Sequence, residues 1–412
     1  MTPHDQKSPR TKRIIFVNRY FYPDQSATSQ MLSDLAFYLG RNGAEVTVVA
    51  SRQLYDDPNA ALSPEEVCGN VHIRRVWTST FGRQRLITRV IDYLSFYLGT
   101  ALWLLVNLSH DCCIVAKTDP PLISVVTALI AGLRGAVHLN WLQDLFPEVA
   151  TALNVRMAGN LEFPLRRLRN WSLRASRTNV VIGEKMREKL LDEGIFPGRI
   201  AVLHNWSDGD SIRPIPPEQN ALRLEWGLRD KFVIGYSGNM GRGHDFGTLF
   251  EAARLLNDDP RIMFLLIGNG ARRDEIAAQS AKCGLKNILF KPFQPRELLP
   301  QSLTAPDVHL VSLLPELEGL MVPSKFYGIA AAGRATIYIG DPDGEIGSIL
   351  RDESCGLAVR SGDSHALARV LERLSRDMEC VFLMGRNARA VFERTFDKKL
   401  ALPAWKTVLG MK

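Results

Sequence analysis

The sequence predicts an α/β protein built from two Rossmann-like, doubly wound domains that face each other across a cleft. The chain has 412 residues, which is more than a single core usually accommodates. Short apolar runs of strand length alternate with amphipathic helical stretches, as in a parallel sheet covered by helices. The alternation stops at a proline-rich segment and then begins again, so the second half repeats the architecture of the first.

Composition and charge limit the kinds of function. Hydrophobic residues make up 46% of the chain and charged residues 23%, which excludes a disordered chain. The net charge of +7 suits an acidic ligand, an anionic membrane surface or nucleic acid, and charge alone does not choose among them. The six cysteines form no CxxC pair and have no metal-ligand spacing, so we expect a reducing cytosol and no metal site.

The first domain is predicted to cover residues 13–205. It opens with a βαβ unit, in which apolar runs at 13–18 and 45–51 flank a helix at about 30–41. Residues 206–219 contain three prolines and no periodicity, so they form the linker. Further strands of this domain are predicted at 71–77, 112–118, 136–144, 178–183 and 199–205.

The second domain is predicted to cover residues 220–394. The tail, residues 395–412, is predicted to form an amphipathic helix that crosses back to the first domain. Five strands are predicted before the last helices, at 231–238, 262–270, 287–293, 307–313 and in the apolar run that ends at Gly340. Helices are predicted at 246–256, from about 271, at 295–303, 345–352 and 364–376.

Two stretches of the first domain indicate contact with a membrane surface. The apolar segment 90–108 has the length of a transmembrane span, but polar residues such as Asp92 and Asn107 favour a globular helix with exposed apolar surface. Residues 164–177 place five arginines among leucines and Trp171, as in a helix that rests on anionic headgroups. The alternative is a solvated helix with a buried apolar stripe. We expect a cytoplasmic protein, peripheral at the inner face of the plasma membrane.

Residues 315–340 are predicted to form the centre of the site. Pro323 and Ser324 mark a helix start, with Ser324 as its cap, and Gly333 ends that helix. The backbone N–H groups of Gly319, Leu320 and Met321, together with Lys325, are predicted to bind an anion such as a diphosphate, with Glu318 as an acceptor at the rim.

Two glycine-rich loops are predicted to complete this anion site. Each follows a strand and precedes a helix, so backbone can approach a ligand closely there. Neither loop is a GxGxxG fingerprint, and the chain has no GxxxxGK[ST] motif. The residues assigned to the ligand are Gly238, Asn239, Gly241, Arg242, His244, Gly268 and Gly270, with Phe293 and Gln294 beside the base.

The facing domain supplies polar residues from loops that follow its strands. Asp119 and Asp144 could orient or deprotonate a hydroxyl group, and the alternative for Asp144 is a helix cap. Ser26, Thr28 and Glu148 lie in loops at the same sheet edge and are assigned to the acceptor side.

At these residues the chain resembles the two-domain GT-B glycosyltransferases of family 4, most closely the bacterial polysaccharide and colanic-acid type. The resemblance covers residues 14–400 and implies a retaining glycosyltransferase with a nucleotide-sugar donor in the second domain and an acceptor on the first. The matching phrases are FYPDQSATSQMLSDLA, VTVVASRQLYDDP, VAKTDPPL, WLQDLFPE, VIGYSGNMGRGHDFGTLFEA, FLLIGNG and EGLMVPSKFYGIAAAG.

The chain departs from the pattern of that family at two places. The family commonly has two glutamates separated by seven residues, where this chain has Leu320 and Gly328, with Glu318 two residues early. Asn239 stands where the family often has arginine. Arg242, His244 and Lys325 therefore remain to meet the diphosphate.

The leading hypothesis is transfer of a sugar from a UDP- or GDP-linked donor to a growing, polyprenyl-linked cell-surface glycan. Asp144, Glu318, Lys325 and Arg242 are assigned the catalytic roles, with no metal, no cofactor beyond the nucleotide sugar and no nucleic-acid partner. One alternative is a sugar-nucleotide epimerase of the same fold, which needs no acceptor. Another is a non-catalytic protein that binds nucleotide sugars.

Overall fold

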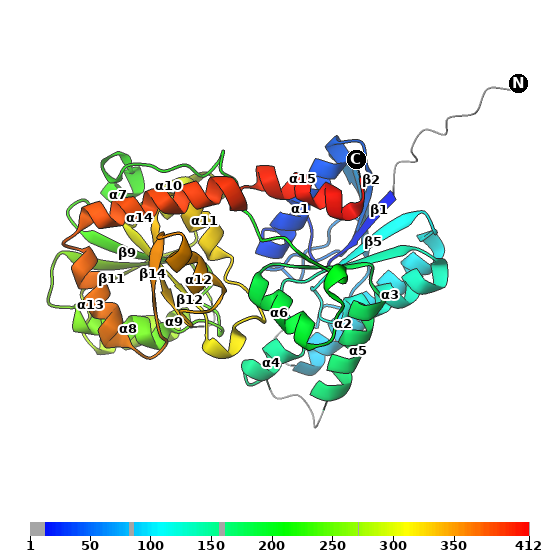
Figure 1. Cartoon of the computed structure of the whole chain (residues 1–412), viewed down its shortest axis with the longest axis horizontal. Helices are drawn as coiled ribbons and strands as arrows, with labels where there is room; N and C mark the ends of the chain where they lie inside the picture. The colour runs from blue at the N-terminus through cyan, green and yellow to red at the C-terminus, as the bar shows by residue number, and fades with distance from the viewer. Residues whose placement is uncertain (1–12, 82–85, 156–160, 271, 412) are drawn as a thin grey trace, which may run out of the picture.

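The computed structural model describes residues 13–81, 86–155, 161–270 and 272–411. It contains two α/β domains side by side, joined by the linker and by the last helix, which runs from the second domain back onto the first (Figure 1). The chain is therefore a pair of open sheets, each covered by helices.

The first domain is built on an eight-stranded sheet with the strand order β3-β4-β2-β1-β5-β6-β7-β8. Neighbouring strands are parallel except β3, which pairs antiparallel with β4 at one edge. The strands are β1 (Arg13–Val17), β2 (Glu45–Ser51), β3 (Glu65–Cys68), β4 (Val71–Val76), β5 (Cys112–Lys117), β6 (Val137–Trp141), β7 (Thr178–Val181) and β8 (Ile200–Val202). The helices are α1 (Ala27–Arg41), α2 (Leu86–Asn107), α3 (Ile123–Arg134), α4 (Glu148–Ala152), α5 (Glu162–Ala175) and α6 (Glu184–Asp192).

The second domain is built on a six-stranded parallel sheet with the order β11-β10-β9-β12-β13-β14. The strands are β9 (Phe232–Ser237), β10 (Ile262–Ile267), β11 (Ile288–Lys291), β12 (Val308–Ser312), β13 (Ala335–Ile339) and β14 (Gly356–Val359). The helices are α7 (Ala221–Glu225), α8 (Phe246–Leu255), α9 (Arg273–Lys282), α10 (Leu299–Thr304), α11 (Lys325–Ala331), α12 (Glu345–Asp352), α13 (Ser364–Leu374) and α14 (Met378–Val391), followed by a π-helical turn, η5 (Phe392–Phe396), and α15 (Lys398–Leu409).

The predicted α/β fold with two doubly wound sheets is confirmed, with differences at the sheet edges. Central strands such as β12 and β13 are buried along their whole length, which is why they appear in the sequence as continuous apolar runs. Two edge strands, β3 and β14, were not predicted because each is short and only partly buried. Helix α14 was also missed. Helix α1 begins at Ala27, three residues before the predicted start.

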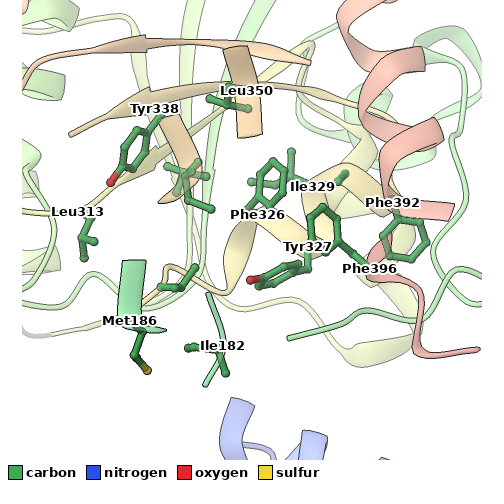
Figure 2. Close-up of a cluster of buried hydrophobic side chains, with 14 of the residues drawn as sticks. Ile182, Met186, Leu313, Phe326, Tyr327, Ile329, Tyr338, Leu350, Phe392 and Phe396 are labelled. Carbon is green, nitrogen blue, oxygen red and sulfur yellow. The ribbon is translucent and has the colours of Figure 1, made fainter. Parts of the chain in front are cut away.

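The two domains share one hydrophobic core across their boundary. Ile182 and Met186 of the first domain belong to the same buried cluster as Phe326 and Tyr338 of the second (Figure 2). Backbone also crosses the boundary, because Leu145 donates its N–H to the carbonyl of Leu320 at 2.9 Å. The loops that follow β6 and β12 are consequently held against each other.

The chain crosses between the domains twice, and the two crossings pair with each other. Ser207 and Asp397 form an isolated parallel bridge, and Lys398 makes an ion pair with Asp208. Beyond this point α15 packs on α1, with Trp405 fully buried and its ring centroid 4.5 Å from that of Trp141. The last helix is therefore part of the core of the first domain.

Candidate functional site

Two glycine-rich loops follow the neighbouring strands β9 and β10 and pack against each other. Gly238 and Gly268 have φ angles of 130° and 134°, a conformation that residues with side chains rarely adopt. A Cβ atom at Gly268 would lie 2.2 Å from the carbonyl oxygen of Gly238, and one at Gly270 would lie 2.4 Å from Oδ1 of Asn239. Only glycine lets these loops meet, and the meeting leaves backbone at the carboxyl edge of the sheet.

Lys325, at the start of α11, lies across the first of these loops. A Cβ atom at Gly238 would be 2.7 Å from Cε of Lys325, so the glycine makes room for the lysine stem. The Nζ atom lies 2.9 Å from Nε2 of His244 and 5.1 Å from the ring centroid of Tyr236. His244 is held in turn by its Nδ1, which is 2.6 Å from the carbonyl oxygen of Ser312.

The protonation states of this pair follow from its partners. A carbonyl oxygen only accepts, so Nδ1 of His244 carries the proton and Nε2 accepts from Lys325. Burial and then the nearby Lys325 charge lower the pKa of His244 to about 4, so the ring is neutral near pH 7. Burial lowers the pKa of Lys325 to about 8. The lysine is therefore a cation near pH 7, with two N–H groups left for a ligand.

Other predicted donor residues lie on the same loops. Arg242 and Asn239 are exposed, and Gly241 lies between them. The ring of Phe293 lies beside Gly268, and 56% of that side chain is exposed. An exposed aromatic ring at this edge offers a flat apolar face to a planar ligand.

The side chain of Gln294, unlike the exposed ring of Phe293, has a local hydrogen bond: its Nε2 donates to the carbonyl of Pro292 at 3.0 Å. It lies next to the exposed ring and is partly buried. Its side-chain amide is therefore engaged within its own loop.

Glu318, which was predicted at the rim of the anion site, has a different role. One carboxylate oxygen accepts the N–H of Glu345 at 2.7 Å, and the other accepts the hydroxyl of Tyr338 at 3.1 Å. Burial raises the pKa of Glu318. Its carboxylate fills the space beside Gly344, where a Cβ atom would lie 2.4 Å from Cδ of Glu318. The structure therefore corrects the prediction, because Glu318 caps α12.

The residues after Glu318 also differ from the prediction. Leu320 and Met321 donate their N–H groups to the carbonyl of Leu317, at 2.9 and 3.3 Å, so these amides are not available to an anion. Gly319, with φ of 75°, packs on α6 of the first domain. Ser324 occupies the N-cap position of α11 but makes no capping hydrogen bond with its side chain. This segment therefore joins the domains, and Lys325 is the predicted anion ligand that it presents.

Asp144 approaches the second domain from the loop after β6. Its backbone forms an antiparallel bridge with Met321, four residues before Lys325. Burial, and to a lesser degree the charge of Asp119, raise the pKa of Asp144 to about 7. Asp119 is partly buried in the loop after the neighbouring strand β5. The two predicted acceptor-side carboxylates thus lie close enough to influence each other.

Ser26 and Thr28 lie at the start of α1, at the same sheet edge. The N–H of Ser26 donates to Oδ1 of Asp24 at 2.9 Å, and the Ser26 hydroxyl bonds the same oxygen. The carbonyl oxygen of Thr28 accepts from Nζ of Lys117 at 2.8 Å. Lys117 is fully buried, and burial lowers its pKa well below the usual value.

One carboxylate oxygen of Glu148 is held by arginines, whereas the other, Oε2, is buried without a hydrogen-bond partner. Its Oε1 accepts from Nη2 of Arg169 at 2.6 Å and lies 3.4 Å from Nε of Arg166. Arg166 also pairs with Glu193. The ion pair between Glu148 and Arg169 ties α4 to α5, and the assignment of Glu148 to the acceptor side stays a prediction.

Two cationic residues beneath the first-domain loops were missed by the sequence analysis. Arg19 is buried, and its Nη2 lies 3.1 Å from Oε1 of Gln53 and 3.9 Å from Oδ2 of Asp92. Lys117 lies 3.6 Å from the ring centroid of Trp141. A charged residue at the carboxyl end of an otherwise apolar strand is the sequence signal that could have revealed both.

Within the described part of the chain, no group of three or more His, Cys, Asp or Glu side chains is arranged to hold a metal ion. The charges that converge on the glycine loops come from Lys325 and Arg242. The arrangement suits an anionic ligand with a planar ring at one end.

Two family models together match most of the chain. One, described as glycosyl transferases group 1, matches residues 219–391, and the other, described as a glycosyl transferase 4-like domain, matches residues 27–206.

Among curated proteins, a probable glycosyltransferase, WbjE of Pseudomonas aeruginosa, is 23% identical over 397 residues, 95% of this chain and 96% of its own. A putative colanic acid biosynthesis glycosyl transferase, WcaI of Escherichia coli K12, is 28% identical over 284 residues, 66% of this chain and 68% of its own. The first match therefore spans nearly the whole chain and the second a smaller part of it.

Solved structures share the fold. Sucrose-phosphate synthase from Thermosynechococcus elongatus superposes with a TM-score of 0.76 at 14% identity, covering 97% of this chain and 98% of its own. HepE of Anabaena in complex with UDP superposes with a TM-score of 0.71 at 15% identity, covering 97% of this chain and 99% of its own.

Affinity for a nucleoside diphosphate should fall as pH rises through about 8, because Lys325 loses its charge there. Titration calorimetry with UDP from pH 6.5 to 9 measures this decline. Lys325→Ala should bind UDP weakly, and its affinity should vary little over the same range. Lys282→Ala, at an exposed lysine of α9, is the matched control and should follow the wild type. A wild-type affinity that does not change across this range would contradict the assignment.

Proposed function

Because this chain belongs to the two-domain GT-B glycosyltransferases of family 4, we propose that it transfers a sugar from a UDP- or GDP-linked donor to a growing, polyprenyl-linked glycan at an anionic membrane surface. The observation that carries this proposal is the Lys325–His244 pair, seated on the glycine loops of one domain, in a segment whose Met321 bridges to the backbone of Asp144 in the other.

The donor is proposed to lie on the second domain with its diphosphate at Lys325 and Arg242. As the bond between the sugar and the diphosphate breaks, negative charge grows on the departing phosphate oxygens. Two N–H groups of Lys325 remain for those oxygens, and they are already oriented by His244. The exposed guanidinium of Arg242 adds a second cation. The exposed face of Phe293 is proposed to receive the base.

The acceptor is proposed to lie on the first domain, with its hydroxyl group at Asp144. A carboxylate with a pKa of about 7 is half ionised near neutral pH, so it can accept the proton that the acceptor hydroxyl loses. Burial keeps that pKa high, and the charge of Asp119 adds to the effect. The backbone N–H of Arg19 donates to the carbonyl of Asp119 at 2.7 Å, and Lys117 ties the strand that precedes Asp119 to Thr28 at the start of α1.

The names of similar proteins support the class of donor and acceptor. HepE of Anabaena has been crystallised with UDP-glucose, and relatives carry the names of colanic acid and capsular polysaccharide biosynthesis glycosyltransferases. These names favour transfer over the epimerase and non-catalytic alternatives. They also support the proposal that the acceptor of this chain is a polymeric glycan.

Contact with a membrane is proposed for the face formed by α2, α3 and α5, which pack side by side. Helix α2 is long and apolar enough to cross a membrane by length and composition, yet Phe96 and Leu104 bury one side of it in the first domain. Its opposite side exposes large apolar side chains: Ile87, Val90, Ile91, Leu94, Leu98, Leu102, Leu105 and Val106. Leu129 and Leu133 of α3 and Phe163, Leu168 and Trp171 of α5 extend the exposed apolar surface.

The basic part of this face is smaller than the sequence indicated. Arg169 is buried in its ion pair with Glu148, and Arg166 pairs with Glu193. Arg167 is exposed and remains to meet anionic headgroups. Arg174 and Arg177 are exposed too, but Arg174 donates to the carbonyl of Glu193 and Arg177 donates to the carbonyl of Val408 in α15.

Transfer is tested by supplying purified protein with a panel of UDP- and GDP-sugars and a polyprenyl-diphosphate-linked sugar acceptor. Product should form in the presence of EDTA, with the anomeric configuration of the donor retained. Asp144→Asn should lower the turnover of transfer by about 100-fold or more, since proton transfer by a positioned side chain contributes about that much, while UDP binding persists. Glu184→Ala, at an exposed residue of α6, should match the wild type.

Three results would contradict this function. Conversion of the donor without an acceptor would indicate an epimerase, and donor binding without any turnover would indicate a binding protein. Activity that disappears with EDTA and returns with Mg²⁺ would overturn the metal-independent chemistry.

Membrane contact is tested with liposomes that contain anionic phospholipids. The wild type should pellet at low salt and be partly released at high salt, because exposed charges are screened beyond roughly 8 Å at physiological ionic strength. Replacing Leu98 and Leu102 by glutamate should abolish pelleting, and Arg167→Glu should weaken it by about 1 kcal/mol. The matched control carries glutamate at Phe382 and Leu383, which are exposed on α14 of the other domain. Pelleting that persists in carbonate would instead mean that α2 spans the bilayer.

A further inference from the structure

Two glutamates link the N-termini of two helices across the domain boundary. Glu318 accepts the N–H of Glu345, the first residue of α12, at 2.7 Å. The carboxylate of Glu345 then reaches the first domain, where it accepts the N–H of Lys185 in the first turn of α6 at 2.9 Å. The two helices lie on the sides of the domains that face each other (Figure 1). Two consecutive capping contacts therefore connect residues 318–324 of the second domain, here called the donor loop, to α6 of the first domain.

Both contacts depend on a glycine at the N-cap position of the helix that is capped. A Cβ atom at Gly344 would lie 2.4 Å from Cδ of Glu318, and one at Gly183 would lie 2.6 Å from Cδ of Glu345. Neither glycine has a positive φ angle, since Gly344 has φ of −71° and Gly183 has φ of −169°. These glycines therefore serve the close approach of a carboxylate and are not required by the backbone conformation.

The environment of Glu345 makes its contact with the first domain specific. The side chain is buried, with 6% of the residue exposed. Its other oxygen lies 3.9 Å from Nδ1 of His204, in the segment that leads into the linker. A buried carboxylate is costly unless hydrogen bonds satisfy it, and the N–H groups of a helix start are suited to do so. Separation of the domains would remove these partners.

We infer that Glu318 and Glu345 are positioning residues that latch the two domains together. The latch holds Asp144 of the first domain at the donor loop, which leads into Lys325. The inference rests on the proposed function. Glu318 fixes the start of the loop that contains Met321, and Met321 bridges to Asp144. Glu345 fixes α6, on which Gly319 packs. The latch therefore holds the segment of Asp144 against the segment that leads into Lys325.

The latch is tested by comparing transfer kinetics with UDP binding in four variants. Glu345→Ala should lower kcat/KM for the acceptor on the order of 10- to 100-fold, which is the cost of a small misplacement of reacting groups. Its UDP affinity should stay unchanged, because Lys325, His244 and Arg242 all lie in the second domain. Glu345→Gln keeps an oxygen that can accept the N–H of Lys185, and it should recover most of the rate.

Two further variants keep the test independent of folding. Gly183→Ala places a methyl group against the Glu345 carboxylate and should reproduce the kinetic loss of Glu345→Ala without touching the acidic residue. Glu184→Ala is the matched control, because that exposed carboxylate pairs within α6, with Arg187 at 3.4 Å. It should behave as the wild type.

Small-angle X-ray scattering gives a readout that needs no activity. Without ligand, Glu345→Ala and Gly183→Ala should have a larger radius of gyration than the wild type and the control. Wild-type kinetics and scattering in Glu345→Ala would overturn the latch, and a parallel loss of UDP affinity would show that Glu345 supports the donor site itself. A wild type that transfers no sugar would refute the proposed function, whereas the scattering comparison would still decide the latch.

Discussion

The site depends on the contact between the half-buried ammonium group of Lys325 and the ring of His244. Burial makes the charge of Lys325 costly, as its lowered pKa records, and neutral His244 accepts one of its N–H groups without adding a second charge. The lysine stem can lie there only because Gly238 has no side chain, and the neighbouring loop can meet Gly238 only because Gly268 has none. An anionic ligand would complete this arrangement by supplying the missing negative charge.

The second constraint is the fixed relation between the domains. A shared hydrophobic core, the bridge between Asp144 and Met321 and the capping contact of Glu345 on α6 all join the same faces. The last helix crosses back and places Trp405 in the core of the first domain. These contacts hold the backbone of Asp144, whose carboxyl group has a pKa of about 7, beside Met321 in the segment that precedes Lys325. A group transfer between two bound substrates needs such a fixed relation between the domains that carry them.

Periodicity predicted the two sheets and most of their elements, because central parallel strands are buried on both faces and helices keep one apolar stripe. The glycine loops, Lys325 and His244 were assigned to one site from loops after strands and from a helix start, and the structure places them in contact. Long-range partners were not predictable. Glu318 was misassigned because nothing local reveals that its carboxylate reaches Glu345, 27 positions along the chain. The contact between Glu148 and Arg169 was missed because it depends on the packing of α4 against α5. The short edge strands β3 and β14 lacked the apolar run that identifies a central strand.

The most direct test of this account is the gain in affinity that the diphosphate gives to a nucleoside, measured by titration calorimetry as the ratio of the Kd values for uridine and UDP. In the wild type that ratio should be large, because two N–H groups of Lys325 and the guanidinium of Arg242 act on the phosphates. In His244→Ala the ratio should collapse while uridine binding is unchanged, since the lysine loses the partner that orients it. A ratio in His244→Ala equal to that of the wild type would contradict the claim that the Lys325–His244 pair forms the diphosphate site.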